Sequence, residues 1–422
     1  MTNAKNNETK QEQELKSCPV PAALAPVRQL KKGEQVSALI FEGGGTKGAA
    51  YAGVVKALDA AGLVKDVKHF AGASAGAMTA AILAAGHDGP ALAKFIKEAP
   101  WEKLMKSISY LKVVGLASKF ALKSGGSAIQ TFLEEEVFTK GHFEKLAETE
   151  GWTAKIKPKQ DWGRITLGEL ADYRGVHLKI AVIEATTGVW KLIDHETEKD
   201  LETGKGRYAD MPVAVATRAS MAFPIIFTPV EFVDKHGVKE LFVDGGFIAS
   251  AGNMPVRAFV DASLSGRTLC CDLISTAQYA DLLRVHGATS ECEAAAAQYK
   301  KFLAEKKQQK QDVKENKISG PFAFVGFLKA LLGTMMTVNS QSIGVASKLR
   351  EAKLDDDQCQ SLAVKLPKDT DVIMIDVGDA VSFDDNLEAV EITAMEARGR
   401  EAVKRYLEYD LPAEVSARNA NY

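Results

Sequence analysis

The chain lacks several features that define large classes of protein. Its 422 residues contain only five cysteines, an odd number without a C-x-x-C pair, which argues against a disulfide framework and against a zinc site. Positive and negative side chains nearly cancel, 53 against 55, so a basic nucleic-acid-binding protein is not expected. No apolar run approaches 18 residues, so no transmembrane helix is expected.

The N-terminal segment also lacks the apolar stretch of a secretory signal peptide. Residues 1–34 are polar and Pro-containing, and we expect a disordered tail there. Such a tail fits a cytoplasmic enzyme and a protein exported by a non-Sec route equally well. One folded domain is predicted over 35–410, with an insertion at about 271–367 and a C-terminal tail at 411–422.

Strand and helix patterns alternate at the start of this domain. Apolar runs predict strands over 37–41 and 67–71, and small and apolar residues at helical spacing predict helices over 49–58 and 74–85. This order indicates an α/β fold with a mostly parallel central sheet. Later strands are expected at 178–183, 239–243 and 372–376, and a long helix at about 386–408.

A glycine cluster follows the first predicted strand, in the order Gly43-Gly44-Gly45-Thr46-Lys47-Gly48. Successive glycines at a helix N-terminus allow backbone N–H groups to converge on an anion, either a phosphate or a transient oxyanion. The same residues also read G-x-G-x-x-G, and Asp66 follows at about the distance seen in dinucleotide-binding proteins. Both interpretations remain open on this segment alone.

A second motif lies between the next strand and helix. Gly72-Ala-Ser74-Ala-Gly76 reads G-x-S-x-G, the nucleophile elbow, in which a sharp turn exposes a serine hydroxyl at the start of a helix. The flanking glycines permit such a turn without side-chain clashes. We therefore predict that Ser74 is a nucleophile, with Gly72 and Gly76 shaping its turn.

A third motif supplies a candidate base. Asp244 follows an apolar strand and precedes Gly245 and Gly246, which form its supporting loop. A serine hydroxyl needs a base to become nucleophilic, and a desolvated carboxylate within hydrogen-bond reach meets that need. A triad in the order Ser74, Asp244 and His286 is a less favoured alternative, because the Asp-Gly-Gly loop and the upstream glycine cluster favour a dyad.

Together these segments resemble the patatin-like phospholipase family. The resemblance is carried by residues 41–48, 53–58, 72–77, 217–224 and 244–246, with weaker matches at 165–170 and 253–256. It implies a three-layer α/β/α fold and a lipid acyl hydrolase of the phospholipase A or lysophospholipase type, using a Ser74–Asp244 dyad without cofactor or metal. It also implies an oxyanion hole from the backbone around Gly44, Gly45 and Thr46, within the cluster from Gly43 to Lys47.

The chain departs from the family pattern in the glycine cluster and after Asp244. Lys47 stands where most members carry Arg, which resembles a bacterial toxin-type subgroup, some of whose members need a host protein activator. The loop before Asn253 is longer than usual, and Gly252 replaces a common second Asn.

Contact with a phospholipid membrane is predicted from the apolar stretch at 321–336, which follows a Lys-rich run at 300–317. The region 104–122 is a candidate lid, and peripheral membrane association is expected in the active enzyme. Other function classes remain as alternatives: an acyltransferase using Ser74, a nucleotide-binding protein using 43–48, and a non-enzymatic effector. The oligomeric state is not indicated by the sequence.

Overall fold

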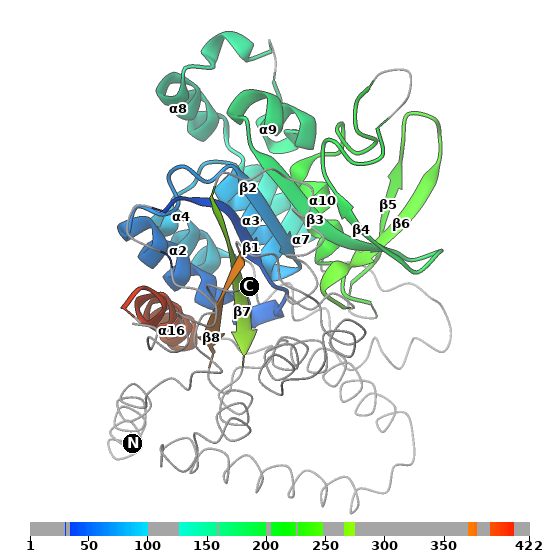
Figure 1. Cartoon of the computed structure of the whole chain (residues 1–422). Coiled ribbons are helices and arrows are strands. Elements are labelled where there is room, and N and C mark those ends of the chain that lie inside the picture. The colour runs from blue at the N-terminus through cyan, green and yellow to red at the C-terminus, as the bar shows by residue number, and fades with distance from the viewer. Residues whose placement is uncertain are drawn as a thin grey trace, which may run out of the picture.

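One sheet organises the part of the chain that the computed structural model describes, which comprises residues 30, 34–99, 126–157, 160–199, 204–224, 227–247, 266–274, 370–377 and 389–408 (Figure 1). Its strands are β1 (Val36–Phe41), β2 (His69–Ala73), β3 (His177–Glu184), β4 (Val189–Ile193), β5 (Val230–Val233), β6 (Lys239–Asp244), β7 (Arg267–Ile274) and β8 (Thr370–Asp376). The hydrogen-bonded order is β5-β6-β3-β2-β1-β7-β8, with β4 paired to β3. The pairs among β1, β2, β3, β7 and β8 are parallel, whereas β3–β4, β3–β6 and β5–β6 are antiparallel. The predicted α/β fold with a mostly parallel central sheet is confirmed.

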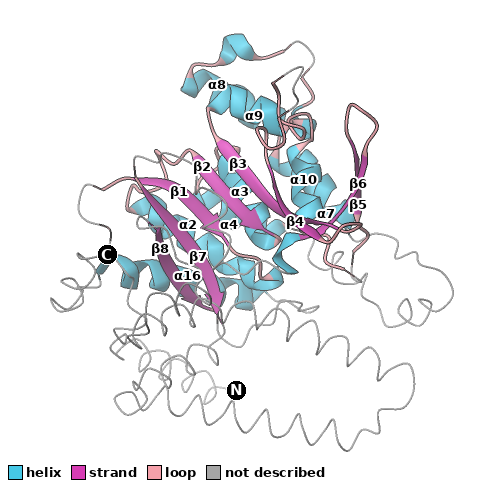
Figure 2. Cartoon of the chain, turned by 45° about the vertical axis from the view of Figure 1, so that its right-hand side comes forward, coloured by secondary structure: helices cyan, strands magenta, loops and turns pink. Residues whose placement is uncertain are grey.

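Helices accompany this sheet. The α-helices of the described ranges are α2 (Tyr51–Ala60), α3 (Ala75–Ala84), α4 (Gly89–Glu98), α7 (Gly126–Phe132), α8 (Lys140–Glu150), α9 (Leu167–Arg174), α10 (Val213–Ser220) and α16 (Ala389–Glu408). Short turns of other helix types are η2 (Gly45–Ala50), η5 (Leu133–Val137), η6 (Thr153–Lys155), η7 (Trp162–Arg164) and η8 (Gly245–Phe247). Both views show α2, α3, α4, α10 and α16 on one side of the sheet (Figures 1 and 2).

The core forms where the sheet meets these helices. Alternate residues of β1 serve its two faces: Leu39 and Phe41 belong to the large cluster shared with the helices, while Ala38 and Ile40 belong to a small cluster on the opposite face. α3 is buried along its whole length. A helix that is apolar on every side belongs in the centre of a domain. Ser74 therefore directly precedes a rigid, buried helix.

The structure shifts several predicted boundaries. The second strand runs over His69–Ala73 instead of 67–71, because small residues let it keep pairing with β3 up to Ala73, directly before Ser74. The first helix is preceded by the 3₁₀ turn η2, and the last begins at Ala389. Strands β4, β5 and β7 were not predicted, since the first two are short and partly exposed and the third carries charged residues.

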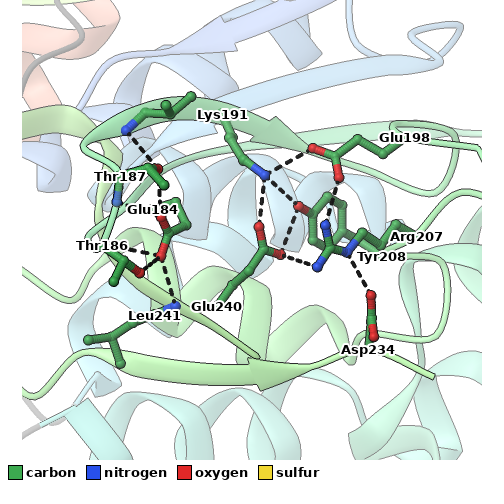
Figure 3. A network of polar contacts seen from close by, with 11 residues as sticks. Glu184, Thr186, Thr187, Lys191, Glu198, Arg207, Tyr208, Asp234, Glu240 and Leu241 are labelled. Carbon is green, nitrogen blue, oxygen red and sulfur yellow. Dashed lines mark hydrogen bonds and ion pairs between the residues drawn. The ribbon is translucent and has the colours of Figure 1, made fainter. Parts of the chain in front are cut away.

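A network of charged and hydroxyl groups braces β6. Lys191 of β4 pairs with Glu240 of β6 at 2.8 Å and with Glu198 at 3.0 Å, and the Tyr208 hydroxyl donates to Glu240 Oε2 at 3.0 Å (Figure 3). Arg207 extends the network to Glu198 at 3.1 Å. Because several partners share each charge, the network ties β6 to β4 and to the segments that carry Glu198, Arg207 and Tyr208.

Several predictions concern residues outside the described ranges. These are the 1–34 tail apart from Leu30 and Glu34, most of the 271–367 insertion, the 411–422 tail, the candidate lid at 104–122, the segments 300–317 and 321–336, and the residues Gly252, Asn253 and His286. Within the described ranges, no helix has both the length and the hydropathy needed to cross a bilayer.

Candidate active site

Ser74 stands at a sharp turn between β2 and α3. Its backbone has φ 52° and ψ −122°, a left-handed conformation that residues with side chains rarely adopt. The flanking glycines allow the turn: a Cβ on Gly72 would lie 2.2 Å from the Gly76 carbonyl oxygen, and a Cβ on Gly76 would lie 2.1 Å from the Phe41 carbonyl oxygen. The turn leaves Ser74 partly exposed between buried neighbours, as a nucleophile elbow requires.

The register of β3 brings Asp244 to Ser74. β2 pairs with β3 up to Ala73 opposite Ala181, and β6 pairs with β3 from Asp244 opposite Val182. β4 pairs with residues 180–184 throughout, so it occupies one edge of β3 and leaves β2 and β6 to share the other. The two strands therefore meet end to end, and the residues that close them, Ser74 and Asp244, become neighbours.

Asp244 is buried, with 2% of its surface exposed. Its carboxyl group accepts hydrogen bonds from the Ser74 hydroxyl and, at 2.7 Å, from the Gly246 N–H. Burial raises the pKa of Asp244 to about 7 against the opposing effect of these two bonds. A carboxyl group with this pKa exchanges protons close to neutral pH.

The glycines around this pair let three backbone segments approach closely. A Cβ on Gly43 would lie 3.3 Å from the Ser74 Cβ, and a Cβ on Gly246 would lie 3.1 Å from Asp244 Oδ1. A Cβ on Gly245 would lie 2.2 Å from the Ala181 carbonyl oxygen. The glycine cluster that contains Gly43 and the loop that follows Asp244 therefore both lie against Ser74.

The glycine cluster turns beside the first turn of α3. Gly45 has φ 58° and opens η2, whose Lys47 N–H donates to the Gly44 carbonyl at 3.2 Å. A Cβ on Gly48 would lie 2.6 Å from the Ala75 Cβ, so this segment packs directly against the residue after Ser74. Thr46 is buried with 2% exposure. The backbone from Gly43 to Lys47 therefore borders the serine, and its role as an oxyanion hole stays a prediction.

Sequence reasoning assigned no role to Ser220, at the C-terminal end of α10. Its hydroxyl oxygen accepts the Ser74 N–H at 2.9 Å, and its proton is donated to the Ala181 carbonyl at 2.6 Å. The Asp244 N–H donates to the carbonyl of nearby Ala222 at 3.0 Å. The segment after α10 thus fixes both members of the pair. Ser220 lies within residues 217–224, which carry part of the family resemblance, and this was the sequence signal that could have identified it.

A buried carboxyl pair lies under the glycine cluster and was also missed. Glu42 and Asp272 are 6% and 1% exposed and hydrogen-bond to each other, which requires one of them to carry a proton. Burial raises the pKa of Asp272, while Glu42, Lys47 and the Leu273 N–H oppose the rise. Burial lowers the pKa of Lys47, against the attraction of both carboxyl groups. The Lys47 ammonium therefore interacts electrostatically with both buried carboxyl groups.

The position of Asp66 weighs against nucleotide binding. In a dinucleotide-binding fold the acidic residue that binds the ribose lies at the carboxyl end of the sheet, near the glycine turn. Here Asp66 lies in an exposed turn before β2 begins, at the edge opposite the glycine cluster. The residue that follows β2 at the correct edge is Ser74.

Comparisons with known proteins identify the family of the chain. A family model described as patatin-like phospholipase matches residues 39–260. The uncharacterized protein YqhO of Bacillus subtilis (strain 168) is 26% identical over 227 residues, which cover 52% of this chain and 65% of that protein, slightly less than two thirds of its length.

Two solved structures are also similar. VipD from Legionella pneumophila has 17% identity and a TM-score of 0.43, with 92% of this chain and 71% of that chain covered. ExoU from Pseudomonas aeruginosa, solved in complex with SpcU, has 15% identity and a TM-score of 0.35, with 92% and 84% covered. Since the family model spans more than half of the sequence, the chain belongs to the patatin-like phospholipase family.

Proposed function

We propose that this protein hydrolyses fatty-acyl esters of membrane phospholipids, with Ser74 as nucleophile and Asp244 as its base. The observation that supports the proposal most is the hydrogen bond between the Ser74 hydroxyl and a buried carboxyl group whose pKa is raised to about 7. The strained turn at Ser74 and the family membership support the same conclusion. A base near neutral pKa is well matched to deprotonating a hydroxyl at physiological pH.

In this mechanism the ionised Asp244 takes the proton of Ser74 as its Oγ attacks the ester carbonyl. The backbone N–H groups around Gly44, Gly45 and Thr46 stabilise the tetrahedral oxyanion, and each such donor contributes about 3–4 kcal/mol to the barrier reduction. Asp244 then protonates the departing lysophospholipid oxygen. Water, deprotonated by Asp244, hydrolyses the acyl-enzyme, which releases the fatty acid and restores the serine.

The direct test measures fatty-acid release from phospholipid vesicles and hydrolysis of a soluble ester. Ser74→Ala and Asp244→Asn should each abolish both activities. Asp66→Asn is the matched control for Asp244→Asn, because it makes the same chemical change at the residue that a nucleotide-binding function would use. Retained hydrolysis in Ser74→Ala, or loss of hydrolysis in Asp66→Asn, would contradict the proposal.

Two conditions refine this assay. Each variant is measured with and without eukaryotic lysate, because the resemblance implies a host activator for some relatives. For the soluble ester, kcat/KM should rise about tenfold per pH unit below pH 7 and level off above it, since only the ionised Asp244 acts as base. Product analysis with an added alcohol acceptor distinguishes hydrolysis from acyl transfer.

A further inference from the structure

Three histidines gather at the edge of the sheet opposite Ser74. His69 opens β2 and His177 opens β3, and the parallel register pairs them. Their rings stack with centroids 4.6 Å apart and planes at 7°. His195, just after β4, places its ring centroid 5.1 Å from that of His177. Residues far apart in the sequence thus form one imidazole cluster.

A carboxylate completes the donor set. Glu196 lies 3.9 Å from His177 Nδ1 through one oxygen and 3.8 Å from His195 Nε2 through the other. One donor atom from each of these three side chains lies within 4.8 Å of the other two. In the described part of the chain, no other group of three His, Cys, Asp or Glu side chains comes this close.

The loop that carries two of these donors is held in place. Asp194, 2% exposed, accepts the N–H of Glu196 at 2.6 Å and that of Thr197 at 2.5 Å. The Lys179 ammonium lies 3.5 Å from the Asp194 carboxylate, which offsets its positive charge. A Cβ on Gly206 would lie 2.3 Å from the His195 carbonyl oxygen, so a second segment packs against the loop. The backbone that carries His195 and Glu196 is therefore fixed before any ligand arrives.

We propose that His177, His195 and Glu196 bind a divalent transition-metal ion such as Zn²⁺. Two imidazoles and one carboxylate are a ligand set that Zn²⁺ accepts, with water in the fourth position. Ligands at about 2.0–2.2 Å in tetrahedral geometry lie roughly 3.5 Å apart. The histidine nitrogens lie 3.8 and 3.9 Å from the Glu196 oxygens, and the three donor atoms are all within 4.8 Å of one another, so side-chain rotations bring them into range of one ion. Glu196 is half exposed and can make such a rotation.

This site is separate from the ester chemistry. His69 and Ser74 are separated by five residues along β2, or about 16 Å at the rise of a strand. A metal at His177 is therefore outside the reach of the serine. Its effect is to link the start of β3 to the loop after β4, so it stabilises the fold at this edge.

The test uses the full chain stripped of metal by a chelator and titrated with Zn²⁺ by calorimetry. The wild type should bind one Zn²⁺ at this site and show a raised melting temperature. His195→Ala and Glu196→Gln should each weaken binding by more than about a hundredfold, because changes to outer-shell partners already cost about 10–100-fold. His236→Ala, an exposed histidine in the β5–β6 turn, is the matched control and should bind as the wild type does.

Cobalt distinguishes this site from one made by cysteines. Co²⁺ bound here should give visible d–d bands without thiolate charge-transfer absorption. Wild-type protein that binds no Zn²⁺, or Zn²⁺ binding unchanged in both His195→Ala and Glu196→Gln, would overturn the proposal. Circular dichroism checks that each variant is folded. Both substitutions lie on a surface loop, so the test does not depend on altering a strand.

Discussion

The Ser220 hydroxyl accepts the backbone N–H of Ser74 at 2.9 Å, across 146 positions of the sequence. The same hydroxyl donates to the Ala181 carbonyl in β3 at 2.6 Å. A residue with φ 52° is strained and keeps its conformation only where its surroundings hold it. Ser220 supplies one such restraint, because it ties the turn at Ser74 to the neighbouring strand.

Ser220→Ala should therefore slow ester hydrolysis without unfolding the protein. The substitution leaves a backbone N–H and a buried carbonyl without this partner, at a cost of about 1–3 kcal/mol. We expect kcat for a soluble ester to fall about tenfold, the equivalent of ~1.4 kcal/mol, with a smaller change in KM. Thr217→Val on the same helix removes a buried hydroxyl whose bond to Val213 is local, so its kcat should stay near wild type. Equal kcat losses in both variants would refute a specific role for Ser220.

The motifs predicted the centre of this site because they reflect local backbone constraints. Gly72 and Gly76 are readable in the sequence since any side chain there would collide with backbone. Asp272 and the histidine cluster gave no comparable signal, and the signal for Ser220 was only its place in the 217–224 match. Their contacts depend on which strands are neighbours in the sheet, and hydrophobic periodicity does not encode strand order. β7 shows this, since its pairing with β1 and β8 joins segments far apart in the chain.

Gly76→Ala should prevent stable folding or cost more than about 3 kcal/mol of unfolding free energy. Its Cβ would lie 2.1 Å from the Phe41 carbonyl oxygen and 2.5 Å from that of Glu42, and backbone on a central strand cannot move aside. The measurement is urea denaturation. Gly141→Ala in α8 is the control: nothing lies within 4 Å of its added Cβ, so stability should be unchanged or rise by up to about 1 kcal/mol. A stable, active Gly76→Ala protein would contradict the packing of this turn.

Lys47→Met should destabilise the protein by about 1–3 kcal/mol, because the Glu42–Asp272 pair loses the cation that faces it. Asp272→Asn should recover part of this loss in the double variant, which gives a coupling free energy of about 0.5–3 kcal/mol between the two positions. The exposed Lys94, 3.8 Å from Glu98, provides the control, and Lys94→Met should change stability by less than about 0.5 kcal/mol. Additive effects of Lys47→Met and Asp272→Asn, measured by urea denaturation, would show that the two groups do not interact.

Asp244→Asn should stabilise the protein while removing its activity, and the gain should depend on pH. The folded-state pKa of Asp244 is raised from 3.8 to about 7, so the folded protein holds this proton more tightly than the unfolded chain. Stability from this group is fully present below pH 3.8 and is lost as pH rises towards 7. Asparagine does not ionise, so its unfolding free energy does not change with the ionisation at this position. The unfolding free energy of the variant, relative to that of the wild type, should therefore rise by about 2–3 kcal/mol between pH 5 and pH 8 and level off above pH 7. Urea denaturation of both proteins across this range measures the difference. A constant difference would mean that Asp244 titrates outside this range, and neither the proposed base nor the pH profile of the soluble-ester assay would then stand.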